Sequence, residues 1–316
     1  MAIHRLTQLT VGVPDPEAAI GFYEAFGLSN LGQGRFATRD GGEQLRLVPA
    51  RWRGVQRIGV GCDDPDDLER ISAAAERAGH SATRHAAPTP SLEVADPASG
   101  VVFEVSVASR LTPTAHPLPA VNTPAQTARP DRPADGVLRN GPVEPTALSH
   151  LVLGTPDWAA TLAFATGVIG FEVSDSLDGV IAFTRCSESH HNLAVQQAPC
   201  RLLHHMAFEV DDVDEVARGG SALTAADAGR HVWGLGRHAI GSNWFWYLRD
   251  PAGNYVEYTA DLDRITSSED YRPKDWQGQE WLYAYGPPVP PVFLEPDDVA
   301  DLLAAQAAGE DTPTTR

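Results

Sequence analysis

Histidines gather in the second half of this chain of 316 residues. Seven of its eleven histidines follow residue 146: His150, His190, His191, His204, His205, His231 and His238. An imidazole can bind a metal ion or transfer a proton near neutral pH, although a single histidine on a strand is more often only structural. The informative histidines are therefore those that meet other polar side chains on one face of a sheet.

Two expected strands each place one histidine on the face away from the core. In ALSHLVLG, residues 147–154, alternation puts His150 and Val152 on the same face. In LLHHMAFEV, residues 202–210, alternation puts His204 on the apolar face that packs on a helix and leaves His205 on the opposite face. His150 and His205 are the candidate ligands, and His204 is assigned to the core.

Glu257 is the third candidate ligand. It lies in the expected strand of AGNYVEYTAD, residues 252–261, where an acidic side chain among tyrosine and valine needs a cationic partner. Two imidazoles and one carboxylate on three strands are the donor set that holds non-heme Fe(II) and leaves coordination positions open. Zinc proteases place the same residue types in a helical H-E-x-x-H, which is absent here. We expect Fe(II), with Mn(II) as the alternative.

The strands that carry these residues belong to a duplicated chain. LTVGVPDPEAAIGFYEAFGLS, residues 9–29, recurs as LVLGTPDWAATLAFATGVIGFEVS, residues 151–174, at an offset of 142. Each half divides again into two units, and every unit has the pattern of a strand, a helix and three further strands. The sequence therefore predicts an α+β fold of four βαβββ modules, paired into two domains.

The duplication provides an internal control for the metal site. The positions that match His150, His205 and Glu257 in the first half hold Gln8, Arg57 and Glu104. An amide and a permanent cation do not bind a metal, so the first half has the pattern of the fold without the ligand set. We expect one metal per chain, in the second half.

Composition divides the chain further and excludes several functions. We expect a metal-free module pair in residues 1–107, a proline-rich linker in 108–146 and a catalytic module pair in 147–263. Residues 264–300 are expected to form an aromatic and proline-rich tail that packs on the active site, and residues 301–316 a frayed terminus. The net charge of −18 argues against nucleic acid as a partner. No apolar run is long enough to cross a membrane and no export signal is recognised, so a cytoplasmic protein is expected.

Three segments resemble one family, the extradiol (meta-cleaving) catechol dioxygenases of the vicinal oxygen chelate superfamily. They are ESHHNLAV (188–195), LLHHMAFEVDDVDEV (202–216) and GLGRHAIGSNWFWYLRDPAGNYVEY (234–258), and the likeness extends over nearly the whole chain. It implies a cupped, barrel-like mixed sheet in each domain and a homo-oligomer. It also implies cleavage of a catechol-type aromatic ring with O2, giving a hydroxymuconic semialdehyde-type product.

The resemblance also implies roles for individual residues. It makes His150, His205 and Glu257 the metal ligands and His191 the acid/base residue. His238 and Tyr247, nine residues apart as in the family, are then the groups that contact the substrate oxygens.

The chain departs from both of the branches that it resembles. The biphenyl-diol branch has an Asn-Asp pair shortly after His238, and this chain has none. The homoprotocatechuate branch has a carboxylate-binding arginine where this chain has Trp233. We therefore expect a catechol without a carboxylate and a pocket walled by Trp233, Phe183 and Phe245, with Lys274 as the one cation that could reach a substrate acid.

Alternatives from other classes stay open on the sequence alone. One is an oxygenase of the same superfamily that acts on an aminophenol, a hydroquinone or another non-catecholic aromatic. A glyoxalase-like lyase or isomerase would use the metal without O2. A metal-free binding protein would have no use for the three ligands together. Metal content and oxygen consumption distinguish these classes.

Overall fold

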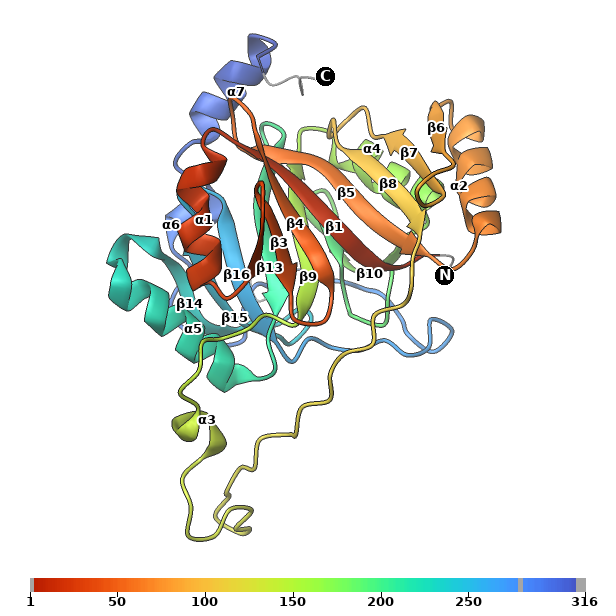
Figure 1. Ribbon diagram of the computed structural model, residues 1–316. Coiled ribbons are helices and arrows are strands. Elements are labelled where there is room, and N and C mark those ends of the chain that lie inside the picture. Colours follow the sequence, from red (N-terminus) through yellow and green to blue (C-terminus); the bar gives the residue numbers. More distant parts are fainter. Residues whose placement is uncertain (1–2, 278–280, 311–316) are drawn as a thin grey trace.

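The computed structural model describes residues 3–277 and 281–310, and each half of the chain forms one mixed β-sheet (Figure 1). The elements of the first half are β1 (Ile3–Val13), α1 (Pro16–Ala25), β2 (Ser29–Gly32), β3 (Arg35–Thr38), β4 (Gly42–Pro49), β5 (Gly54–Cys62), α2 (Pro65–Arg77), β6 (Ala82–His85), β7 (Ser91–Ala95) and β8 (Val102–Val107). Those of the second half are β9 (Ala147–Thr155), α4 (Trp158–Phe164), a π-helical turn η1 (Ala165–Ile169), β10 (Glu172–Leu177), β11 (Ile181–Arg185), β12 (Leu193–Gln197), β13 (Leu202–Glu209), α5 (Val213–Ala226), a short 3₁₀ turn η2 (Ala228–Arg230), β14 (His231–Arg237), β15 (Trp244–Arg249) and β16 (Tyr255–Ala260). The four predicted βαβββ modules are confirmed.

An aspartate cap begins the main helix of every module. Asp15, Asp64, Asp157 and Asp212 each precede such a helix, and each side chain accepts a hydrogen bond from a backbone amide of the first turn. Such a cap satisfies amides that have no partner within the helix and stabilises it by about 1 kcal/mol. The repeated cap is thus the local reason why each first strand turns into a helix at the same point.

The strand order places the first strands of paired modules at the centre of each sheet. The orders are β2-β3-β4-β1-β5-β8-β7-β6 and β14-β15-β16-β13-β9-β12-β11-β10-β17, in which β17 is Lys274–Asp275. In the second sheet β9 and β13 are antiparallel neighbours, and β16 lies parallel to β13. The three strands that carry the candidate ligands are therefore adjacent.

One apolar core joins the two halves. The ring of Phe26, which follows α1, stacks on Tyr258 of β16 at 3.9 Å, and the Tyr258 hydroxyl donates to the Phe26 carbonyl at 2.8 Å. Phe164 of α4 packs in turn against Phe103 of β8 at 5.6 Å. This core covers one face of the second sheet, and the opposite face is left for the candidate site.

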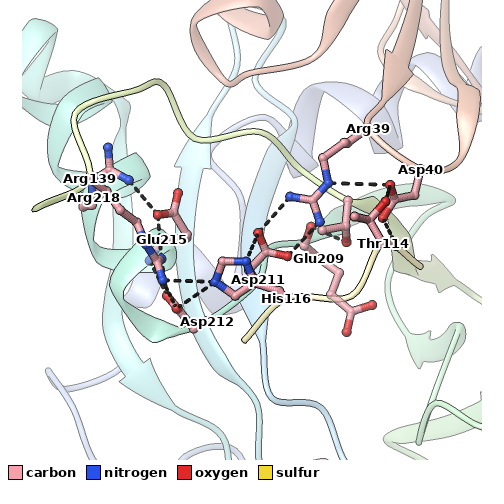
Figure 2. Close-up of polar contacts among 11 residues, drawn as sticks. Arg39, Asp40, Thr114, His116, Arg139, Glu209, Asp211, Asp212, Glu215 and Arg218 are labelled. Atoms are coloured by element: carbon pink, nitrogen blue, oxygen red, sulfur yellow. Dashed lines mark hydrogen bonds and ion pairs between the residues drawn. The ribbon is translucent and has the colours of Figure 1, made fainter. Parts of the chain in front are cut away.

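The linker leaves the body of the molecule as a long excursion that includes α3 (Asp135–Leu138) (Figure 1). Figure 2 shows how its two ends are held. Thr114 bonds to Asp40 of the first half, and Arg139 forms ion pairs with Asp212 and Glu215 at the start of α5. The ends of the linker are therefore fixed to both halves.

The segment after the second module pair contains β17 (Lys274–Asp275), α6 (Pro291–Leu294) and α7 (Val299–Ala307). The terminus was expected to fray from residue 301, and this expectation needs correction. Val299 and Leu302 of α7 are buried against Leu202, because one face of this short helix is apolar. The part of the prediction that falls on 311–316 lies outside the described residues.

The helices in the described part of the chain are all too short or too polar to cross a membrane. The cytoplasmic location stays a prediction.

Candidate metal centre and its cavity

His150, His205 and Glu257 meet on the open face of the second sheet. The strand register aligns His150 on β9 with Ala207 on β13 and Glu257 on β16, and His205 lies two residues before Ala207. One ligand atom from each of the three residues lies within 4.8 Å of the others. Because Ala207 is small and fully buried, the longer side chains on either side of it can converge above it.

The donor set fits a cation. Glu257 has no exposed surface, and its Oε2 has no hydrogen-bond partner within the described residues, while its Oε1 accepts from Asn243 at 3.2 Å. Oε2 lies 3.2 Å from Nε2 of His150 and 3.5 Å from Nε2 of His205. A buried carboxylate oxygen without a donor is costly unless a positive charge compensates it. These three groups match the ligand set expected for Fe(II) or Mn(II).

Burial favours the form of His205 that binds metals. Desolvation, with smaller repulsion from neighbouring histidines, lowers the pKa of His205 well below its ordinary value. The imidazole is therefore neutral at physiological pH, and a neutral imidazole is the form that coordinates a cation.

A cavity of about 240 Å³ opens beside the three ligands. The second half supplies the apolar lining residues Val152, Val180, Ile181, Phe183 and Ile240. The tail supplies Trp281, Leu282, Phe293 and Leu294. The polar lining residues are Gln196, Tyr247 and five histidines, and no lysine or arginine is among the lining residues that the structure describes.

His191 lines this cavity next to the candidate metal ligands. Its ring centroid lies 4.3 Å from that of His150, and its Nδ1 lies 3.1 Å from Nδ1 of His190, which leaves Nε2 for the cavity. Burial, followed by repulsion from the surrounding histidines, lowers the pKa of His191 well below its ordinary value. A neutral imidazole in this position can accept a proton from a bound hydroxyl group.

His238 and Tyr247 form a hydrogen-bonded pair on another wall. Nε2 of His238 lies 2.8 Å from the Tyr247 hydroxyl, and its Nδ1 lies 2.5 Å from the carbonyl oxygen of Leu282. Because a carbonyl only accepts, Nδ1 carries the hydrogen and Nε2 accepts from tyrosine. Burial raises the pKa of Tyr247 well above its ordinary value, so the hydroxyl keeps its proton.

Of the four residues predicted for the substrate pocket, three lie outside the cavity lining. Phe183 lines the cavity, 5.1 Å from the ring of His191. Trp233 and Phe245 instead pack against Tyr247 and His238, because the register places Trp233 opposite Tyr247 on β14, the edge strand of the sheet and the one furthest from the ligand strands on this side. Lys274 is exposed and lies over the ring of Trp276 at 3.4 Å, outside the cavity lining. The walls are therefore more aliphatic than predicted.

The assignment of His204 to the core is also wrong. The register of β13 shifts between Leu203 and His205, so His204 is the extra residue of a β-bulge and strict alternation fails there. His204 lines the cavity beside His205. A pair of adjacent histidines was the only sequence signal, and alternation alone could not reveal the bulge.

The first half carries the same geometry with different chemistry. Gln8, Gly59 and Glu104 align across β1, β5 and β8 as His150, Ala207 and Glu257 do in the second half. Arg57 occupies the position of His205 and forms an ion pair with Glu104 at 3.3 Å. A fixed cation thus takes the place that a metal would occupy, and the one group of potential metal ligands among the described residues is that of the second half.

The second half of the chain is similar to known proteins. Residues 147–258 match the model of the Glyoxalase/Bleomycin resistance protein/Dioxygenase superfamily. Metapyrocatechase 2 of Cupriavidus necator is 40% identical over 154 residues, which cover 48% of this chain and 48% of that protein. Biphenyl-2,3-diol 1,2-dioxygenase of Paraburkholderia xenovorans is 36% identical over 121 residues, 35% of this chain and 40% of that protein. The matched segments therefore span less than half of these relatives.

A solved structure is similar over most of the chain. The Mn(II)-bound glyoxalase from Novosphingobium aromaticivorans superposes with a TM-score of 0.72 at 26% identity and covers 90% of this chain and 91% of its own. Sequence relatives that are named for iron dependence and for manganese dependence both occur. The predicted fold class is confirmed by these likenesses.

Proposed function

We propose that this chain, whose residues 147–258 match the model of the Glyoxalase/Bleomycin resistance protein/Dioxygenase superfamily, is an extradiol dioxygenase that cleaves a catechol with an apolar substituent. The observation that carries the proposal is one apolar cavity lined by five polar groups, with the third candidate ligand, Glu257, buried beside two of them. The five are His150, His205, His191, His238 and Tyr247. The similarity to metapyrocatechase and to a biphenyl-diol dioxygenase supports it.

Fe(II) is the proposed metal and Mn(II) the alternative, held by His150, His205 and Glu257. Once bound, the metal would supply a Lewis-acid centre with open positions for both diol oxygens and for O2. The likeness to a Mn(II)-bound protein supports manganese as the alternative.

The polar residues of the cavity divide the proton chemistry between them. Neutral His191 accepts a proton from a catechol hydroxyl through Nε2 and returns it as the ring opens. Tyr247 keeps its proton and donates it to Nε2 of His238 at 2.8 Å, so its hydroxyl oxygen stays free to accept a hydrogen bond from a substrate hydroxyl. A general acid/base in such a role contributes about a hundred- to ten-thousand-fold to the rate.

The cavity selects for an apolar substituent. Val180 and Leu294 lie at its partly exposed edge, and no cationic side chain is among its described lining residues. A carboxylate would lose hydration there without a partner, at a cost of several kcal/mol. An alkyl or aryl group would gain about 25 cal/mol for each square ångström that it buries.

Oxygen uptake by the Fe(II)-loaded protein with a panel of catechols tests this proposal. We expect uptake with alkyl- and phenylcatechols and a clearly lower kcat/KM for homoprotocatechuate. A preference for the acid would refute the substrate class. The absence of uptake with every catechol would refute the activity.

A glyoxalase-like isomerase or lyase is the second candidate, because the structure of such a protein is similar over 90% of this chain. It would use the same metal ligands without O2. Conversion of a hemithioacetal under anaerobic conditions would favour it over the dioxygenase.

We also infer a homo-oligomer that assembles through the linker. Four large apolar side chains of this excursion are exposed: Leu118 (91%), Val121 (66%), Val137 (74%) and Leu138 (53%). A second copy that packs on this excursion, which is held at both ends, would remove these side chains from water. Light scattering of the wild type and of a variant with serine at all four positions tests this inference. A smaller assembly is expected for the variant, and an unchanged mass would refute the role of the arm.

A further inference from the structure

His204 contacts both the candidate metal ligand His205 and Phe293 of the tail. Its Nδ1 lies 2.8 Å from Nδ1 of His205, and its Nε2 lies 2.7 Å from the carbonyl oxygen of Phe293. The side chain is only 4% exposed, so water does not compete for these bonds. None of the roles proposed above uses this residue.

The two distances determine where the hydrogens lie. A carbonyl oxygen can only accept, so Nε2 of His204 carries a hydrogen and donates it to Phe293. In the neutral ring Nδ1 of His204 is then an acceptor, and the hydrogen of the second bond belongs to Nδ1 of His205. This leaves Nε2 of His205 with its lone pair, and that atom is the one that lies 3.5 Å from Oε2 of Glu257.

The first half shows that the fold alone does not require this histidine. The same bulge occurs in β5, where the register shifts between Arg57 and Val55 and Gln56 is the extra residue. The half without metal ligands therefore forms the bulge with glutamine. A histidine is needed at this position only if the hydrogen bonds of its two ring nitrogens have a function.

We propose that His204 is a positioning residue that fixes the tautomer and the orientation of the metal ligand His205: it donates to the Phe293 carbonyl of the tail and therefore accepts from Nδ1 of His205. A ligand imidazole usually donates its second N–H to a fixed acceptor, and loss of that acceptor typically weakens metal binding about 10- to 100-fold. Here the acceptor is itself held by α6, so the tail that closes the cavity also orders the metal ligand. This inference rests on the metal site of the proposed function.

Two matched variants separate the two bonds of His204. In His204→Asn the side-chain oxygen takes the place of Nδ1 and can still accept from His205, but the bond to Phe293 is lost. In His204→Gln the amide can still donate to Phe293, as its length allows, but nothing accepts from His205. Each variant loses one bond at the same buried position, so the two are comparable in stability. His231→Gln, on the exposed start of β14, controls for the loss of a histidine elsewhere.

The readout is the affinity of the metal-free chain for Mn(II), followed by the paramagnetic resonance signal of the free ion. We expect His204→Gln to bind Mn(II) about 10- to 100-fold more weakly than the wild type, with His204→Asn and His231→Gln within about threefold of it. Equal weakening in the asparagine and glutamine variants, or no weakening in either, would overturn the proposal for His204. Failure of the wild type to bind any Mn(II) would instead count against the proposed function.

Discussion

Glu257→Gln should make the metal-free chain more stable while it abolishes metal binding. In the metal-free state Oε2 of Glu257 is buried without a donor, 3.2 Å and 3.5 Å from two imidazole nitrogens. The amide nitrogen of glutamine can donate to such nitrogens, and the buried charge disappears. A buried polar atom without a partner costs about 1–3 kcal/mol, and more when it is charged. We therefore expect the free energy of unfolding to rise by about 1–3 kcal/mol.

Thermal unfolding with and without Mn(II) measures this effect. One kcal/mol corresponds to roughly 2 °C in Tm for a chain of this size, so the metal-free variant should melt about 2–6 °C above the metal-free wild type. Mn(II) at a thousand times its Kd should reverse the order, since it stabilises the wild type by about 4.1 kcal/mol and leaves the variant unchanged.

The first half offers the matched control, Glu104→Gln. Glu104 is already paired with Arg57 at 3.3 Å, so its replacement should not stabilise the chain and should leave the response to Mn(II) intact. A Tm of metal-free Glu257→Gln at or below that of the metal-free wild type would refute the inference that the buried Glu257 carboxylate is uncompensated without a bound cation. An equal gain in the control would refute it as well.

Three further predictions follow from the site. His191→Phe should keep its metal but lower kcat about a hundred- to ten-thousand-fold, measured by oxygen uptake beside metal analysis; an unchanged kcat, or loss of the metal, would make His191 structural. Ala207→Val adds methyl groups where the ligands converge and should cost about 1–3 kcal/mol of stability together with most of the Mn(II) affinity; full affinity would contradict the convergence above this residue. The metal-free chain should lose stability as the pH falls. Burial lowers the pKa of His204 from 6.5 to about 4, so between these values the unfolded chain binds a proton that the folded chain does not. By linkage, this difference in proton binding lowers the free energy of unfolding by about 2 kcal/mol at pH 5. Urea unfolding at pH 7 and pH 5 measures the loss of stability, which should be smaller in His204→Asn. An equal loss in that variant would assign the pH dependence to other groups.

The sequence was sufficient to predict the elements and the convergence of the three candidate ligands, because both depend on short-range periodicity. Alternation put His150 and Val152 on one face, and the duplication identified Gln8 and Arg57 as the inert counterparts of the ligands; the strand registers agree with both. These inferences need only the period of a strand and the offset between the halves.

The parts that could not be predicted depend on tertiary register. A single extra residue in β13 moved His204 from the core to the cavity, and no local signal distinguishes that bulge from a regular strand. The inward turn of the tail, which brings Leu282 and Phe293 to the ligands, depends on contacts with distant strands. Trp233 was predicted at the wall because it stands where one branch of the resembling family has a carboxylate-binding arginine, yet its ring packs against Tyr247 outside the cavity lining.

Mass spectrometry of the product formed under isotopically labelled O2 tests the central claim most directly. The Fe(II)-loaded chain, given an alkylcatechol, should yield a ring-opened product that contains both atoms of one O2 molecule, with one O2 consumed per catechol. A product without labelled oxygen, or a catechol oxidised to a quinone while O2 is only reduced, would contradict extradiol cleavage by this site.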